Sequence, residues 1–303
     1  MAEYVMDVPD QVRIVEVGPR DGLQNEAASV PTAEKIALIR LLAAAGLREI
    51  EATAFVHPQW IPPMADAEAV LASVPRDGGV RYHVLIPNMR GYERALAVRP
   101  DEICLVCSAS ESHNRANLNR STAESLADLA TVAARARADG IAVRGAISTA
   151  FWCPFEGRVP EARVVWVAEH YAAMGVVEVG LADTLGAADP AHVRSLIRRV
   201  RGAVGCTVAL HLHDTYGMAL ACVLAALEED VTRFDSAIGG LGGCPYAPGA
   251  AGNVATEDLV LMLHRLGIRT GVDEAALRDA ARLAQSLVGH PLFSHRMAVT
   301  SGA

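Results

Sequence analysis

Residues 176–214 read VVEVGLADTLGAADPAHVRSLIRRVRGAVGCTVALHLHD. The apolar runs Val176–Leu181 and Thr207–His211 are short and rich in β-branched residues, which is typical of buried strands. Between them, Pro190–Arg201 has apolar residues at helical spacing, begins with proline and stops at Gly202. Proline at the start and glycine just past the end are common helix boundaries. The stretch therefore predicts a strand–helix–strand unit.

The same alternation extends in both directions along the chain. The remaining strand candidates are Arg13–Val17, Glu49–Thr53, Arg81–Ile86, Glu102–Cys107, Val143–Thr149 and Arg233–Ile238. The remaining helix candidates are Pro31–Gly46, Thr122–Asp139, Pro160–Met174, Tyr216–Asp230, Ala255–Leu266 and Asp273–Val288. Strands alternating with helices in eight units predict an α/β fold, the TIM (β/α)8 barrel, with Asp273–Val288 as an extra C-terminal helix. The alternative is an open doubly wound sheet, which more often has about five or six strands.

The composition favours one globular domain. The chain has 303 residues, of which 51% are hydrophobic, and a barrel of this type needs about 250 residues. No low-complexity linker divides it, so we expect a single domain over 1–303, with the barrel at about 12–267 and a helical extension at about 268–303.

Charge and apolar patterning exclude several classes of partner. The net charge of −8 argues against nucleic acid as a partner. No apolar run approaches the ~18 residues of a membrane span, and the first residues have no signal-peptide pattern. Six scattered cysteines suit a reducing compartment. We therefore expect a cytoplasmic protein with no membrane partner.

Polar residues cluster where the predicted strands end, which is where TIM barrels place their active sites. His211 and His213 lie two apart, so in a strand they share a face and can bind one cation. Asp21 and Asn253 would add oxygen ligands, and this donor set suits Mg²⁺, Mn²⁺ or Co²⁺, with Zn²⁺ as a further candidate. The competing interpretation is that the histidines are structural and that Asp21 is a turn or ion-pair residue.

Two further residues have a candidate chemical role. Arg20 beside a metal site predicts a group that stabilises negative charge on oxygen, and its alternative is a salt bridge to Glu51, which could also orient it. Cys244 lies in the glycine-rich segment Gly239–Asn253. The glycines favour a mobile loop, and the thiol is either a proton donor or base, or an inert side chain in a connector.

Together these residues resemble the 3-hydroxy-3-methylglutaryl-CoA lyase family. The segments that carry the resemblance are Val15–Glu26, Cys153–Gly157, Ala182–Thr184, His211–Gly217 and the loop Gly239–Asn253, within a match from about 12 to about 283. The loop sequence is specific to these lyases, whereas Arg20-Asp21-Gly22 and His211-x-His213-Asp214 also occur in related condensing synthases.

The resemblance implies a homodimeric TIM barrel that splits an acyl-CoA substrate into acetyl-CoA and acetoacetate. It implies Mg²⁺ or Mn²⁺ on Asp21, His211, His213 and Asn253. It also implies catalytic roles for Arg20 at the thioester oxygen, for Glu51 beside it, for Asp21 and His211, and for Cys244 in proton transfer. Gln24, Asp183 and Thr184 are expected, with Arg20, to contact substrate. The base stays open between Asp21, a water on the metal and His213.

Two alternatives belong to other classes. A condensing acyltransferase of the same superfamily would join acetyl-CoA to a keto acid, and a non-catalytic homologue would only bind metal or CoA. The acyl group is also open, citramalyl-CoA being an example. Ala27, Ala54 and Gly180 depart from familiar lyases, which carry lysine at the first position and serine at the other two. We expect Ala54 and Gly180 to lie near strand ends and to widen the acyl pocket.

Overall fold

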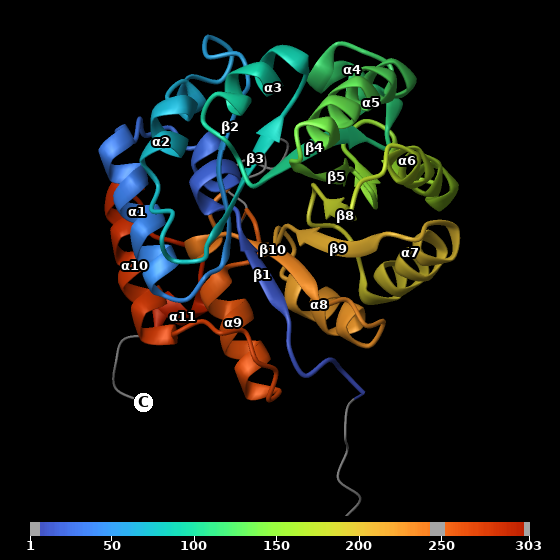
Figure 1. Ribbon diagram of the computed structural model, residues 1–303. Coiled ribbons are helices and arrows are strands. Elements are labelled where there is room, and N and C mark those ends of the chain that lie inside the picture. Colours follow the sequence, from blue (N-terminus) through green and yellow to red (C-terminus); the bar gives the residue numbers. More distant parts are fainter. Residues whose placement is uncertain (1–6, 243–251, 300–303) are drawn as a thin grey trace, which may run out of the picture.

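Eight parallel strands form a closed barrel at the centre of the molecule (Figure 1). The structure is a computed structural model and describes residues 7–242 and 252–299. The barrel strands are β1 (Arg13–Glu16), β2 (Glu49–Ala54), β3 (Arg81–Ile86), β4 (Glu102–Ser108), β5 (Ala142–Ser148), β8 (Glu178–Asp183), β9 (Thr207–Leu212) and β10 (Arg233–Ser236). Strand β1 pairs with both β2 and β10, which closes the sheet. The predicted TIM barrel is therefore confirmed, and the open-sheet alternative is wrong.

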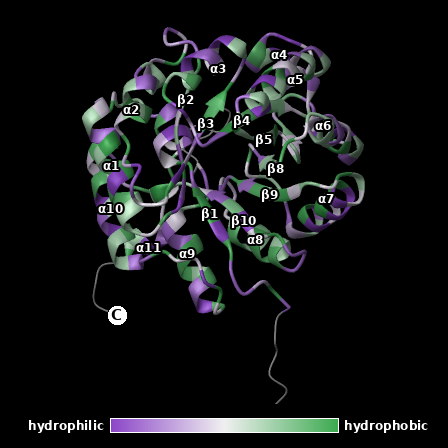
Figure 2. Ribbon diagram, viewed as in Figure 1, coloured by the Kyte–Doolittle hydropathy of each residue, from purple (hydrophilic) through white to green (hydrophobic). Residues whose placement is uncertain are grey.

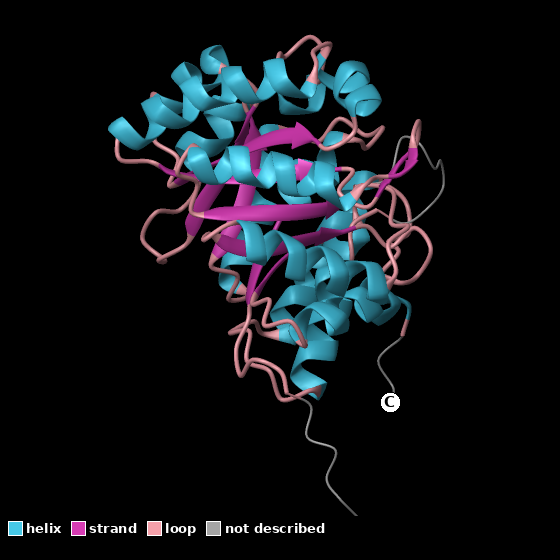
Figure 3. Cartoon of the chain, turned by 90° about the vertical axis from the view of Figure 1, so that its right-hand side faces the viewer, coloured by secondary structure: helices cyan, strands magenta, loops and turns pink. Residues whose placement is uncertain are grey.

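Helices surround the barrel on its outside (Figure 3). They are α1 (Thr32–Ala44), α2 (Ala67–Ser73), α3 (Met89–Leu96), α4 (Glu111–Leu118), α5 (Thr122–Ala138), α6 (Glu161–Ala173), α7 (Pro190–Ala203), α8 (Ala219–Leu227), α9 (Thr256–Arg265), α10 (Glu274–Val288) and α11 (His295–Ala298). Many of these helices carry both hydrophobic and hydrophilic residues (Figure 2). That composition is expected where one helix face packs on the barrel and the other meets water. Among the described residues, no helix has the length and apolar content needed to cross a membrane.

Several elements were not predicted from the sequence. Helices α2, α3 and α4 have 7, 8 and 8 residues, which is too short for a clear periodic pattern. The two-stranded hairpin of β6 (Trp152–Cys153) and β7 (Gly157–Arg158) and the helix α11 were also missed. The last barrel strand is shorter than predicted, because residues Ile238–Gly240 form a 3₁₀ turn, η3, rather than continuing β10.

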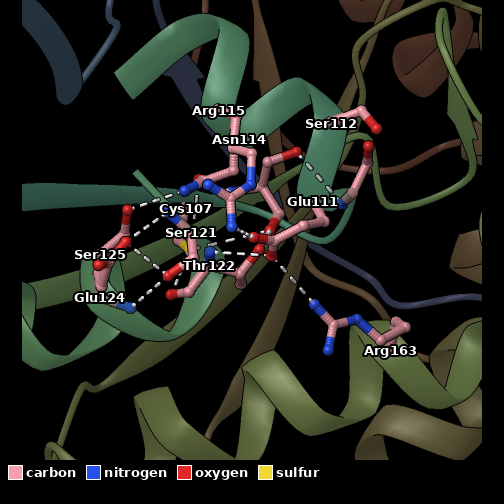
Figure 4. Close-up of polar contacts among 12 residues, drawn as sticks. Cys107, Glu111, Ser112, Asn114, Arg115, Ser121, Thr122, Glu124, Ser125 and Arg163 are labelled. Carbon is pink, nitrogen blue, oxygen red and sulfur yellow. Dashed lines mark hydrogen bonds and ion pairs between the residues drawn. The ribbon is translucent and has the colours of Figure 1, made fainter. Parts of the chain in front are cut away.

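Side-chain hydrogen bonds hold the corner between β4, α4 and α5 (Figure 4). Asn114 accepts a bond from the backbone N–H of Ser108 at 3.1 Å and donates to the Arg120 carbonyl at 2.9 Å and to Ser125 Oγ at 2.8 Å. Ser121 and Glu124 form a capping box at the start of α5. Both helices begin at a side-chain cap: Ser110 accepts the N–H of His113 in α4, and Ser121 accepts that of Glu124 in α5.

Candidate active site at the carboxyl ends of the barrel strands

The motif Gly18-Pro-Arg-Asp-Gly22 forms a π-helical turn, η1, directly after β1. The backbone N–H groups of Arg20 and Asp21 both donate to the carbonyl of Val17, at 3.1 and 2.7 Å. A Cβ atom on Gly18 would lie 2.5 Å from Glu16 Oε1. Only glycine fits at that position, and the turn therefore presents Arg20 and Asp21 side by side at the mouth of the barrel.

Arg20 is held between two carboxylates. Its Nε donates to Glu51 Oε2 on β2 at 2.6 Å, and its Nη1 donates to Asp21 Oδ1 at 2.5 Å. Burial works against its charge, but Glu51 and Asp21 raise the pKa of Arg20 above its usual value. The guanidinium is a permanent cation in a fixed orientation, and the salt bridge to Glu51 that the sequence left open is present.

Three of the expected metal ligands converge. The Nε2 atoms of His211, in β9, and of His213, just beyond it, each lie 3.9 Å from Asp21 Oδ2. Ligand atoms of these three residues all lie within 4.8 Å of one another. The period of two along the strand places both imidazoles on one face, as the sequence predicted.

Asn253 completes the group from the far side of the glycine-rich segment. It pairs with His213 through an isolated bridge, and its Nδ2 donates to Asp21 Oδ2 at 2.7 Å. Asn253 Oδ1 is buried and has no hydrogen-bond partner among the described residues. A buried oxygen without a partner is costly unless a ligand uses it. Two imidazoles, one carboxylate and this amide oxygen fit a divalent cation.

The electrostatics of the group suit cation binding. Burial would raise the pKa of Asp21, but Arg20 and the two histidines lower it to about 2, so the carboxylate is ionised. Burial, with His211 nearby, lowers the pKa of His213 to about 4, so the imidazole is neutral at pH 7. An anionic carboxylate and a neutral imidazole are the forms that bind metals.

The expected substrate contacts lie at or near the same end of the barrel. Asp183 ends β8, and its two oxygens accept the N–H groups of Ala187 and Ala188 at 3.1 and 2.8 Å. Thr184 Oγ1 accepts the N–H of Thr149 at 2.9 Å. Gln24 is half-buried just after η1. Their contacts with substrate stay predictions, and Cys244 lies outside the described residues.

Sequence reasoning missed a buried polar network beneath the histidines. Asp235, on β10, lies 3.3 Å from His211 Nδ1, and Arg144, on β5, donates to both Asp235 oxygens at 3.1 Å. The signal was available, because Arg233 and Asp235 alternate around Phe234 in a strand and so share one face. Barrel interiors are usually filled by branched apolar residues, so charged residues on an inward strand face indicate a buried polar network.

The expected place of Gly180 needs correction. Gly180 lies within β8 rather than at its end. It pairs with Ala209, whereas Ala182, two residues further along the strand, pairs with His211. A Cβ atom on Gly180 would lie 3.2 Å from Arg144 Nη2. A serine there would contact the polar network inside the barrel, whereas Ala54 ends β2 as expected.

Known proteins share both the sequence and the fold. The HMGL-like family model matches residues 11–284. A hydroxymethylglutaryl-CoA lyase of Bacillus subtilis is 45% identical, over 97% of this chain and 99% of the relative. The mitochondrial hydroxymethylglutaryl-CoA lyase of Mus musculus is 49% identical, over 90% of this chain and 84% of the relative.

A solved structure of an HMG-CoA lyase is also similar to this chain in sequence and fold. An HMG-CoA lyase from Acinetobacter baumannii, in complex with coenzyme A and 3-methylmalate, is 40% identical and superposes with a TM-score of 0.91. The match covers 99% of this chain and 97% of that one. The chain therefore belongs to the HMGL-like family, together with these hydroxymethylglutaryl-CoA lyases.

Proposed function

We propose that this protein is a metal-dependent carbon–carbon lyase that cleaves 3-hydroxy-3-methylglutaryl-CoA to acetyl-CoA and acetoacetate. The observation that carries the proposal is the convergence of Asp21, His211 and His213 beside the fixed cation of Arg20. The relatives named as hydroxymethylglutaryl-CoA lyases, at 45% and 49% identity, support cleavage of this substrate over condensation of acetyl-CoA with a keto acid.

The reaction breaks the bond between C2 and C3 of the acyl group. A base removes the proton of the C3 hydroxyl, the C3 oxygen forms a carbonyl, and the electron pair of the broken bond moves to C2. The result is acetoacetate and the enolate of acetyl-CoA, which then takes a proton at C2. The site must therefore supply a base, a cation for the enolate oxygen and a proton donor.

Arg20 is the proposed partner of the thioester oxygen. Three of its five N–H groups are engaged by Glu51 and Asp21. Within residues 7–242 and 252–299 the other two N–H groups have no partner and are available to a substrate oxygen. Because the two carboxylates hold the guanidinium in place, little reorganisation is needed when the enolate charge develops. Glu51 acts in this scheme by orienting Arg20.

The remaining roles belong to the ligand group and to Cys244. Asp21, His211, His213 and Asn253 would hold Mg²⁺ or Mn²⁺, which when bound supplies a Lewis acid for the hydroxyl and carboxylate oxygens of the substrate. Asp21, as an anion, and His213, as a neutral imidazole, are the candidate bases for the hydroxyl proton. Cys244 is the proposed proton donor to the enolate, and Gln24, Asp183 and Thr184 are proposed to line the substrate.

Partners and location complete the proposal. Coenzyme A in the A. baumannii structure supports an acyl-CoA substrate here. We expect a homodimer, which sedimentation velocity tests. A cytoplasmic location fits the five described cysteines, Cys104, Cys107, Cys153, Cys206 and Cys222, which are all free thiols.

A substrate panel tests the proposed function. Purified protein with Mg²⁺ is incubated with 3-hydroxy-3-methylglutaryl-CoA, citramalyl-CoA and a longer 3-alkyl homologue, and acetyl-CoA release is followed. We expect the highest kcat/KM for the methylglutaryl substrate. A second arm supplies acetyl-CoA with keto acids. Faster product formation in that arm, or no cleavage of any acyl-CoA, would reject the lyase assignment.

A further inference from the structure

The two ring nitrogens of His211 face different carboxylates. Nε2 lies 3.9 Å from Asp21 Oδ2 in the ligand group, whereas Nδ1 lies 3.3 Å from Asp235 Oδ2. His211 on β9 and Asp235 on β10 are direct partners in the barrel register. Paired residues of neighbouring strands point to the same side of the sheet. Asp235 therefore lies beside His211, inside the barrel and behind the proposed cation site.

Asp235 is itself fixed in position. Arg144 Nη2 lies 3.1 Å from each of its oxygens, and Arg144 Nε lies 3.3 Å from Glu178 Oε1. The side chains of Arg144, Glu178 and Asp235 are 2%, 2% and 7% exposed. A carboxylate held this way has little freedom to rotate and excludes water from the imidazole behind it.

His213 has no equivalent partner among the residues that the structure describes. Its Nδ1 is buried and makes no hydrogen bond within the described parts of the chain. The two histidines therefore differ, because only His211 has a carboxylate behind its ring. Asp235 therefore contacts one of the two histidines of the ligand group, His211, and not the other.

We propose that Asp235, held by Arg144, is a positioning residue that fixes the ring and the tautomer of His211 for cation binding. Asp235 accepts the Nδ1–H of His211, and this leaves the lone pair of Nε2 directed toward the cation site that His211 shares with Asp21. The hydrogen bond made by one ring nitrogen determines which form the other takes. Carboxylates in this position also raise the basicity of the ligand, and their loss typically weakens metal binding about 10- to 100-fold.

The inference rests on the proposed function for the identity of the cation site, but its test does not need turnover. Metal-depleted full-length protein is titrated with Mn²⁺, and free Mn²⁺ is measured by electron paramagnetic resonance. We expect Asp235→Ala to raise the Mn²⁺ Kd about 10- to 100-fold. Asp235→Asn keeps an acceptor for Nδ1–H and loses only the charge, so its Kd should lie between those of wild type and Asp235→Ala.

The matched control is Glu102→Gln. Glu102 is a buried carboxylate of the same barrel interior, but it bonds to Arg233 and lies by His83 rather than by His211. We expect this variant to lose stability and to keep the wild-type Mn²⁺ Kd. Equal loss of Mn²⁺ affinity in Glu102→Gln and Asp235→Ala would show a general structural effect and overturn the proposal.

Nitrogen NMR of wild-type protein with ¹⁵N-labelled histidine reports the tautomer of His211 directly. It tests the proposal even if the Asp235 variants do not fold. The neutral ring of His211, assigned from its absence in His211→Gln, should be protonated at Nδ1 in the metal-free protein. Protonation at Nε2 instead would overturn the proposal.

Wild-type Mn²⁺ affinity in Asp235→Ala would overturn the positioning role of Asp235 while leaving the lyase function intact. A protein that binds Mn²⁺ through His211 but cleaves no acyl-CoA would reject only the lyase function.

Discussion

Arg20 shows how one residue combines a structural and a chemical role. Its salt bridge with Glu51 and its contact with Asp21 are present together, and both fix the plane of the guanidinium. Lysine would keep the charge at this position but would lose the planar fork that meets two carboxylates and an oxyanion at once. The geometry of Arg20, rather than its charge alone, is therefore what the proposed chemistry requires.

The first prediction follows from that geometry. Arg20→Lys should lower kcat by about 10²- to 10³-fold, the loss expected for a preorganised oxyanion donor. Its Mn²⁺ Kd should change much less, because Arg20 contributes no ligand atom. Steady-state kinetics and a Mn²⁺ titration measure the two effects separately. Near-normal turnover in Arg20→Lys would remove Arg20 from the mechanism.

Residues differ in how far the sequence could predict them. His211 and His213 were predictable because strand period alone places them on one face. The pairing of His211 with Asp235 was not, because it depends on which strands are neighbours and on their register. The misplacement of Gly180 has a different cause, namely the strand boundary: β8 begins at Glu178 and extends to Asp183, beyond the predicted strand end at Leu181.

Among the elements near the site, one buried glutamate, Glu16, joins η1 to η3, and a second, Glu257, ties η3 to α9. Glu16 Oε1 accepts the N–H groups of Gly18 and Ile238, each at 2.8 Å, and Glu257 accepts the N–H of Gly239 at 2.8 Å. Burial raises the pKa of Glu16 to about 7 and that of Glu257 to about 8. The turn that holds Arg20 and Asp21 is thus tied to the turn that leads into the glycine-rich segment.

This link predicts a pH dependence of stability. The folded pKa of Glu257 lies above its ordinary value, so its favourable contribution is complete below about pH 4.5 and is lost as the pH rises through about 8. Glu257→Gln is always neutral and should gain stability relative to wild type across that range. Urea unfolding at several pH values measures the difference, with the exposed Glu169→Gln as control. If the unfolding free energies of Glu257→Gln and wild type changed in parallel with pH, the raised pKa of Glu257 would be contradicted.

The corner of α4 and α5 gives a second prediction for elements. Asn114→Ala leaves the Ser108 N–H and the Arg120 carbonyl without their side-chain partner. Unfolding free energy should fall by about 2 kcal/mol, the cost of unsatisfied buried groups. Asn117→Ala, at an exposed position of the same helix, is the matched control. Equal stability of both variants would show that these bonds do not hold the corner.

Elements were predictable in proportion to their length and pattern. All eight barrel strands follow from short apolar runs, and the long helices follow from their periodicity. Glycine follows the ends of α1, α5, α6, α9 and α10, but α7 continues through Gly202, where the sequence predicted its end, to Ala203. Helices α2, α3 and α4 were missed because they are too short for a clear periodic pattern; α3 and α4 begin at the side-chain caps of Asn88 and Ser110, whereas α2 has no such cap. The turn η1 was read only as a strand end, since no sequence pattern identifies a π-helical turn.

At the scale of the whole molecule, the C-terminal extension packs on the barrel mouth. A Cβ atom on Gly239 would lie 2.4 Å from Leu292 Cδ1, and the N–H of Phe293 donates to the Gly239 carbonyl at 3.0 Å. Ser294 Oγ donates to Asp258 at 3.0 Å. We therefore propose that residues 1–303 form one domain, with barrel and extension as one cooperative unit.

One cooperative unit predicts one unfolding transition. Calorimetry should show a single peak whose calorimetric and van't Hoff enthalpies agree. Circular dichroism at two wavelengths should give the same midpoint. A separate, earlier transition assigned to the extension by limited proteolysis would contradict the single-domain proposal.

We propose that the strand-end residues form a metal-dependent lyase centre, and one metal titration distinguishes this from the alternatives. Protein stripped of metal by EDTA and dialysis is given increasing Mn²⁺ with 3-hydroxy-3-methylglutaryl-CoA, and acetyl-CoA and acetoacetate are both measured. We expect no cleavage without metal, a plateau near one equivalent of bound Mn²⁺ per chain, and equal amounts of the two products. Full turnover by the metal-free protein would show that the reaction needs no metal and would contradict the proposed centre.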